Sequence, residues 1–236
     1  MKKIVFSRPF LNNKEILSVN KVIKSGWLTS GKLTQKFEKL VQKKIQCNYA
    51  LAVNSCTNGI FASIIACGIK SGDEVITSAF TYVSTINTLY QLNLKIKLCD
   101  INLDDYSLDT KHLERIISKK TKLIIITHYG GVPTDTKKIL NLCKKYKILL
   151  IQDAATTLGA KVDGKYVGSE KNIISVFSLY ANKIITSGEG GIITTNKLEI
   201  YKKLKKITYC GIDKIPWSRS KIKKKKLVLQ SRYARI

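Results

Sequence analysis

Between residues 173 and 195, two apolar runs enclose a single lysine and a cluster of glycines. The first run covers residues 173–177, and three glycines at positions 188–191 turn the backbone tightly into the second run, residues 192–195. This pattern predicts that Lys183 is presented at a strand end. A lysine that is partly desolvated and near other cations becomes nucleophilic, so Lys183 is a candidate for Schiff-base chemistry. The alternative is an ordinary surface lysine in a lysine-rich chain.

Segments typical of strands and helices alternate along most of the 236-residue chain, in which 44% of the residues are hydrophobic. This alternation predicts an α/β fold with a mostly parallel sheet covered by helices. Strands are predicted near residues 49–53, 75–77, 95–99, 123–127, 148–151, 173–177 and 192–195, and helices near residues 12–24, 33–45, 60–69, 83–89, 109–118, 135–146 and 197–207.

Polar side chains follow several of the predicted strands. Because ligands sit at the carboxyl ends of the strands in such sheets, we expect these side chains to converge on one pocket. Asp153 follows a buried strand, where a carboxylate is costly unless it meets a cation or several donors; the alternative is a helix cap. The aromatic ring of Tyr82 could stack on a flat heteroaromatic ligand. The converging residues are Ser55, Tyr82, Asp153, Ser178 and Lys183.

The segment Ser55, Cys56, Thr57 lies between a predicted strand and the following helix. A helix that begins there would point free backbone N–H groups and the positive end of its dipole at one spot, which suits a phosphate group. The alternative is an ordinary capped helix start.

The formal net charge of +26 raises the hypothesis of a nucleic-acid partner. The basic residues are scattered over every predicted helix, and no nucleic-acid motif accompanies them, so we predict no nucleic-acid partner. Six dispersed cysteines and two histidines do not have the spacing of a metal site, and free cysteines are typical of a reducing compartment. No segment has the length of an export signal or a membrane span, so a cytoplasmic protein is expected.

The stretch from Ser178 to Lys183, followed by Ser-Gly-Glu-Gly-Gly at residues 187–191, resembles the lysine segment of the DegT/DnrJ/EryC1/StrS aminotransferases. The Asp-Ala-Ala run at residues 153–155 and the Gly-Trp-Leu-Thr-Ser-Gly phrase at residues 26–31 also resemble this family. The resemblance implies pyridoxal 5′-phosphate (PLP) as cofactor. It also implies an aspartate-aminotransferase-like fold of type I, whose large domain binds the cofactor.

The resemblance further implies roles for individual residues. Lys183 would be catalytic and would hold the cofactor as a Schiff base, Asp153 would hold the pyridine nitrogen, and Tyr82 would stack on the ring. The remaining cofactor-binding residues would be Ser55, Cys56, Thr57 and Ser178, and the substrate contacts would be Trp27, Thr29, Thr156 and Tyr180.

Four positions depart from the family pattern or leave alternatives open. Cys56 stands where the family has Gly, and Thr156 stands where Gln, Glu or His is common. His128 ends a predicted strand, and we expect a hydrogen-bonded structural residue there rather than a catalytic acid or base. Trp27 is either a substrate contact or a packing anchor.

The resemblance predicts a transaminase that converts a nucleotide-linked keto sugar, such as a 4-keto-6-deoxyhexose, into an amino sugar for surface polysaccharide. Glutamate would be the amino donor, and a complete enzyme would be a homodimer. A related class removes a sugar hydroxyl instead and carries His in place of the lysine, so Lys183 argues against it.

Residues 1–217 are expected to form the cofactor domain, and residues 218–236 a basic tail without family resemblance. Family members continue into a smaller second domain, so we expect a C-terminally truncated chain, for which a frame shift near Ser218 would account. The alternative to an active enzyme is an inactive remnant that at most binds cofactor or another subunit.

Overall fold

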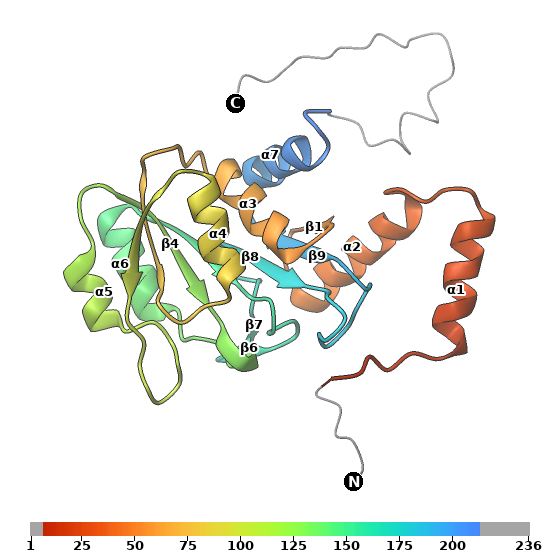
Figure 1. The fold of residues 1–236 in the computed structure, drawn as a ribbon, viewed down its shortest axis with the longest axis horizontal. Helices are drawn as coiled ribbons and strands as arrows, with labels where there is room; N and C mark the ends of the chain where they lie inside the picture. Colours follow the sequence, from red (N-terminus) through yellow and green to blue (C-terminus); the bar gives the residue numbers. More distant parts are fainter. Residues whose placement is uncertain (1–6, 213–236) are drawn as a thin grey trace.

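The computed structural model describes residues 7–212, so the expected boundary at residue 217 and the basic tail at 218–236 lie outside the described residues. Its main sheet contains the strands β1 Tyr49–Val53, β2 Glu74–Ser78, β3 Lys95–Cys99, β4 Thr121–Thr127, β5 Leu149–Asp153, β8 Ile173–Ser178 and β9 Gly191–Thr195. The seven strands lie in the order β1-β9-β8-β5-β4-β2-β3 (Figure 1). Parallel pairs join β3, β2, β4, β5 and β8, which confirms the predicted mostly parallel sheet.

Strand β9 runs against this direction and is antiparallel to both β8 and β1. The reason lies in its connection, because a loop without a helix joins β8 to β9, whereas parallel neighbours need a longer crossover. The lysine-containing stretch is therefore the return loop between two adjacent antiparallel strands.

Helices cover both faces of the sheet. The cluster around Ile151 includes core residues of three helices, and the clusters around Leu150 and Phe177 include core residues of three others on the opposite face. The first set is α3 Cys56–Ala66, α4 Val83–Gln91 and α7 Leu198–Thr208, and the second is α2 Lys32–Ile45, α5 Thr110–Ile116 and α6 Lys137–Tyr146.

Helix α3 corrects the prediction of a helix over residues 60–69. It begins at Cys56, because the Ser55 hydroxyl accepts a hydrogen bond from the Asn58 N–H (3.1 Å) and caps the first turn. It ends at Ala66, before Gly68 adopts a left-handed backbone (φ +77°). Cys56 and Thr57 therefore belong to the first helical turn.

Helix α1 (Asn13–Lys24) stands apart from the sheet (Figure 1) and buries no residue. It starts in a capping box, in which Asn12 accepts from the Lys14 N–H and the Glu15 carboxylate accepts from the Asn12 N–H. Within residues 7–212, no helix combines the length and the apolar character that crossing a membrane requires.

Two small elements were not predicted. Residues Lys161–Val162 (β6) and Lys165–Tyr166 (β7) form an antiparallel hairpin, and a 3₁₀ turn covers Tyr129–Gly131. Asp163 and Gly164, which join β6 to β7, both have positive φ, as a two-residue hairpin turn with the right twist requires.

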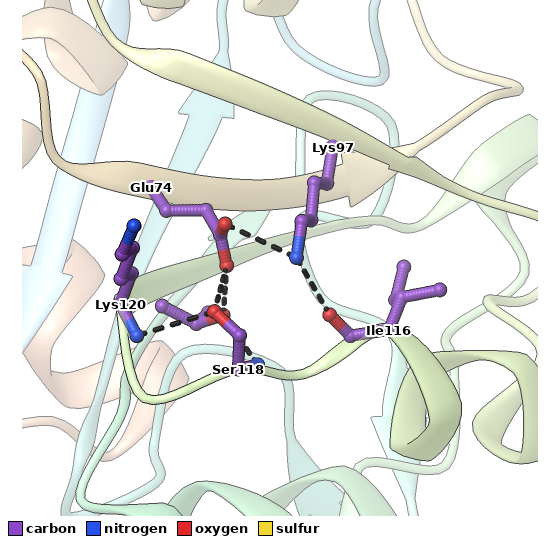
Figure 2. A network of polar contacts seen from close by, with 6 residues as sticks. Glu74, Lys97, Ile116, Ser118 and Lys120 are labelled. Carbon is purple, nitrogen blue, oxygen red and sulfur yellow. Dashed lines mark hydrogen bonds and ion pairs between the residues drawn. The ribbon is translucent and has the colours of Figure 1, made fainter.

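A buried acidic network closes the amino-terminal edge of the sheet (Figure 2). Glu74, at the start of β2, accepts hydrogen bonds from Ser118 (2.7 Å) and Thr121 (2.5 Å) and forms an ion pair with Lys97 (3.1 Å). Lys97 also donates to the carbonyl of Ile116 (3.0 Å). Desolvation acts to raise the pKa of Glu74, but these donors outweigh it and lower that pKa. Glu74 thus ties β2 and β3 to the chain entering β4.

Candidate active site

The β1–α3 turn forms one end of the candidate site. Gly191, the first residue of β9, pairs with Val53 in β1 and with Ser178 in β8. A Cβ at Gly191 would lie 2.7 Å from the Cys56 nitrogen and the Ser55 carbonyl carbon, so only glycine lets the strand pass this close. The sheet therefore brings Ser178 to the side of the capped α3 N-terminus.

The first turn of α3 has the features of an anion site. Its early N–H groups have no partner four residues back in the helix, and the helix dipole places positive charge there. The Ser178 oxygen accepts from the Tyr180 N–H (3.2 Å), which leaves the Ser178 hydroxyl hydrogen available to donate. Thr57 lies partly exposed in the same turn. Ser55, Thr57 and Ser178 could thus surround a phosphate group.

Asp153, the last residue of β5, is only 4% exposed. Its Oδ2 accepts from the Thr85 hydroxyl (2.8 Å), and its Oδ1 accepts from the Ala155 N–H (3.2 Å). Desolvation raises the pKa of Asp153, while these two donors and the positive charge of Lys183 act to lower it. A buried carboxylate whose hydrogen-bond donors are neutral is suited to receive a cationic group.

Cys56 lies beside this carboxylate. Its sulfur is 4.0 Å from the Asp153 Oδ1 and 3.6 Å from the Val176 carbonyl oxygen. Burial and then the Asp153 charge raise the pKa of the Cys56 thiol well above its ordinary value, against a smaller effect of Lys183. Cys56 is therefore a protonated thiol, suited to packing beside the carboxylate rather than to acting as a nucleophile.

Lys183 lies in the return loop between β8 and β9. The loop is closed by hydrogen bonds from the Ser187 N–H and the Thr186 hydroxyl to the Leu179 carbonyl (both 3.0 Å). The Lys183 N–H donates to the Tyr180 carbonyl (3.0 Å). Lys183 thus lies in the loop beyond the carboxyl end of β8, and its positive charge acts to lower the pKa of Asp153.

Tyr82 lies immediately before α4 and is 72% exposed. Its carbonyl accepts the Thr85 N–H (3.1 Å), so the same turn of chain carries Tyr82 and the hydroxyl that contacts Asp153. Phe80, in the same segment, is 38% exposed and packs against Tyr129, with the ring centroids 4.1 Å apart. The exposed ring of Tyr82 is free to lie on a ligand.

Trp27 and Thr29 lie on a neighbouring cavity of about 1300 Å³, whose wall also includes Asn58 and Glu189. The Trp27 indole N–H donates to the Ser30 carbonyl (3.4 Å), and the indole lies against Gly31, where a Cβ would meet it at 2.6 Å. Trp27 therefore has the contacts of a packing anchor and also borders open space. This cavity adjoins the α3 N-terminus and the glycine-rich loop.

The other two expected substrate residues differ in how free their side chains are. The Thr156 hydroxyl donates to the His128 carbonyl (2.9 Å) and accepts from the Gly131 N–H (3.1 Å), so it fastens the turn after β4. Tyr180 is 47% exposed at the start of the Lys183 loop.

His128 is 1% exposed, and its Nδ1 accepts from the Thr134 N–H (3.0 Å). This bond requires the proton of the neutral ring to be on Nε2, which has no hydrogen-bond partner among the described residues. Burial lowers the pKa of His128 to about 4, against a smaller opposing effect of Gln152. A neutral, buried ring fits the expected structural role.

Thr85 is the site residue that the sequence did not reveal. It lies inside a helix, where a threonine has no distinctive pattern, and only its spacing of three residues from Tyr82 could have drawn attention to it. Within residues 7–212, no three His, Cys, Asp or Glu side chains gather as a metal site would require.

The model of the DegT/DnrJ/EryC1/StrS aminotransferase family matches residues 9–232, including part of the segment 218–236. An uncharacterised protein of Methanocaldococcus jannaschii is 39% identical over 212 residues, which is 90% of this chain and 55% of that protein. The chain therefore belongs to the DegT/DnrJ/EryC1/StrS aminotransferase family.

Solved structures extend the likeness to the fold. PseC of Helicobacter pylori, an aminotransferase involved in the biosynthesis of pseudoaminic acid, is 31% identical with a TM-score of 0.81, and the match covers 87% of this chain and 55% of PseC. A GDP-4-keto-6-deoxy-D-mannose-3-dehydratase of E. coli with bound hydrated PLP is 25% identical with a TM-score of 0.80, over 86% of this chain and 53% of that enzyme. The chain spans about half the length of these relatives. PLP is the cofactor of this group, and the residues described above fit it.

Proposed function

We propose that this chain carries the cofactor site of a PLP-dependent sugar aminotransferase, which acts on a nucleotide-linked keto sugar such as a 4-keto-6-deoxyhexose. The observation that carries the proposal is the Asp153 carboxylate, which is buried at a strand end, receives only neutral hydrogen-bond donors and feels the charge of Lys183. A protonated pyridine nitrogen would supply the cation that this carboxylate lacks.

The side chains at the strand ends would bind the cofactor together. Ser55, Thr57 and the first turn of α3 bind the phosphate together with Ser178. Asp153 keeps the ring nitrogen protonated, and Tyr82 covers one face of the ring. When bound, PLP supplies an electron sink for the carbon next to the transferred nitrogen.

Lys183 holds the cofactor covalently through its amine. Once freed by the amino donor, the same amine would be the group of this chain able to hold and move a proton at the substrate carbon. The loop hydrogen bonds at Leu179 fix the backbone that carries Lys183.

We also propose an amino donor, an oligomeric state and a pathway for this enzyme. Glutamate is the proposed amino donor, the enzyme is proposed to act as a homodimer, and the amino sugar is proposed to enter surface polysaccharide. The six cysteines are all free, which supports a reducing cytoplasm. A nucleotide diphosphate would also be attracted by the charge of +26.

The similarity to the E. coli dehydratase makes removal of a sugar hydroxyl the second candidate reaction. Lys183 favours amino transfer, because in the family the hydroxyl-removing enzymes carry His at this position. The third reading is a protein that at most binds cofactor or another subunit and catalyses no reaction.

A product assay separates the three readings. The purified chain is incubated with PLP, glutamate and nucleotide-linked 4-keto-6-deoxyhexoses, and the products are identified by mass spectrometry. We expect an amino sugar from the wild-type protein and none from Lys183→Ala, while Lys171→Ala, which changes an exposed lysine, keeps the activity. A deoxygenated product without nitrogen would favour the dehydratase, and no product from cofactor-loaded protein would favour the remnant.

A further inference from the structure

Thr85 holds the buried carboxylate of Asp153 from the side of α4. Its side chain is fully buried, and its hydroxyl donates to the Asp153 Oδ2 at 2.8 Å. The other carboxylate oxygen, Oδ1, is approached by the Ala155 N–H at 3.2 Å and by the Cys56 sulfur at 4.0 Å. Thr85 thus supplies the shortest of the hydrogen bonds to Asp153.

The position of Thr85 links two sides of the candidate site. Its own N–H donates to the Tyr82 carbonyl (3.1 Å) in the first turn of α4. Asp153 lies at the end of β5, whereas Tyr82 and Thr85 belong to the segment after β2. The Thr85 hydroxyl therefore connects Asp153, which is proposed to bind the ring nitrogen, to the turn that carries Tyr82, which is proposed to stack on the ring.

We propose that Thr85 is a positioning residue, which fixes the orientation of the Asp153 carboxylate and so sets how strongly this protein holds a protonated heteroaromatic nitrogen. The inference rests on the proposed function and deepens it. Thr85 does not contact the cofactor in this account and acts through Asp153.

The physical reason is the cost of a buried charge. Desolvation disfavours the ionised form of Asp153, and the Thr85 hydrogen bond is the first of the effects that oppose it. A hydroxyl is worth more to an ionised acceptor than to a neutral one, and it also restricts rotation of the carboxylate. Without Thr85, the carboxylate would turn or take up a proton and would bind a cationic ring less well.

Thr88 provides a matched control on the same helix. It is 1% exposed, and its hydroxyl donates to the Ser84 carbonyl (2.8 Å) within α4 instead of to Asp153. Replacing either threonine by valine removes one buried hydroxyl and keeps the shape of the side chain. Both variants therefore lose the stability that one buried hydroxyl contributes, but only the change at Thr85 removes a hydrogen bond to Asp153.

The test measures the affinity for PLP by absorbance titration, with unfolding of each cofactor-free protein followed by circular dichroism. We expect Thr85→Val to bind PLP about tenfold more weakly, which is the loss of one hydrogen bond to a charged group. Thr85→Ser should restore the affinity to within about twofold, and Thr88→Val should leave it unchanged. Equal affinities of Thr85→Val and Thr88→Val would overturn the proposal.

A cofactor analogue that lacks the ring nitrogen, 1-deazapyridoxal phosphate, shows whether the effect passes through Asp153. We expect the wild-type protein and Thr85→Val to bind the analogue equally, since it presents no charge to the carboxylate. A tenfold difference with the analogue would assign Thr85 a purely structural role. If Thr85→Val does not fold, Thr85→Ala is compared with Thr88→Ala in the same titrations.

The outcomes also separate this inference from the proposed function. If the folded wild-type protein does not bind PLP, the proposed function fails. If the wild-type protein binds PLP and Thr85→Val binds it equally well, the function stands and the positioning role is wrong.

Discussion

Asp153 is costly to bury, yet it ends a strand in the interior of the protein. Desolvation raises its pKa, and the available donors, Thr85 and Ala155, are neutral. Such a residue lowers the stability of the cofactor-free protein, and a bound cation would offset the cost of burying its charge. The sequence indicated Asp153 because a carboxylate after an apolar strand is unusual, but it did not indicate Thr85, whose contact depends on how α4 packs on the sheet.

The variant Asp153→Asn should separate function from stability. We expect PLP affinity to fall at least about tenfold, because the charge that holds the ring nitrogen is lost. The folded-state pKa of Asp153 is raised, so the native protein gains stability as the pH falls through that pKa, at about 1.4 kcal/mol for each pKa unit. The asparagine variant has no such gain.

Chemical denaturation of the two cofactor-free proteins between neutral pH and about pH 4 measures this difference. The stability of the wild-type protein relative to the variant should rise on acidification. A constant difference over this range would show that Asp153 is not held with a raised pKa.

The elements of the sheet could largely be predicted, because their apolar runs and the helices between them have clear periodicities. The reversed direction of β9 could not be read from periodicity, since it depends on the missing crossover between β8 and β9. The β6–β7 hairpin was missed although Asp163 and Gly164 are a typical turn pair, because the flanking strands are only two residues long each.

The β1–α3 turn and β9 depend on each other through Gly191. A methyl group there would meet the Ser55 and Cys56 backbone at 2.7 Å, and backbone atoms cannot move aside cheaply. We expect Gly191→Ala to cost about 1–3 kcal/mol of stability and to displace the proposed phosphate turn, with a further loss of PLP affinity. Thermal unfolding and PLP titration measure the two effects.

Gly188→Ala is the comparison for this variant. Gly188 has φ +82°, and no atom lies within 4 Å of the place that a Cβ would take, so alanine there adds backbone strain without touching the turn. It should lower stability by roughly 1–2 kcal/mol and disturb PLP binding less than Gly191→Ala. Equal losses of affinity in the two variants would contradict the role given to the close approach.

At the scale of the whole molecule, the two ends of the strands differ in function. The candidate site occupies the carboxyl ends of the strands, whereas the Glu74 network ties strands together at the opposite edge (Figure 2). Parallel strands with ligands at their carboxyl ends are the expected arrangement for this fold class. The Glu74 network can therefore be changed without touching the candidate site.

The variant Glu74→Gln tests this separation. We expect it to destabilise the protein by about 1.5–3 kcal/mol at neutral pH without changing PLP affinity, because Lys97, Ser118 and Thr121 lose a charged acceptor. The folded pKa of Glu74 is lowered, so its contribution is present above the unfolded pKa and is lost as the pH falls through the folded value. The penalty of the variant should therefore shrink in acid.

Glu114→Gln supplies the control, since Glu114 pairs with Lys145 (3.1 Å) at the surface. This change should alter stability by less than about 1 kcal/mol. Chemical denaturation of both variants at neutral and acid pH gives the comparison, and similar penalties for the two would rule out a special role of the buried network.

We propose that residues of this chain alone assemble a PLP site around Lys183. The most direct measurement incubates the purified protein with PLP, reduces it with borohydride and maps the labelled peptide by mass spectrometry. We predict a stable label on Lys183 in the wild-type protein and in Lys171→Ala, and no label at residue 183 in Lys183→Ala. Folded wild-type protein without a label, or with labels scattered over exposed lysines, would contradict the claim.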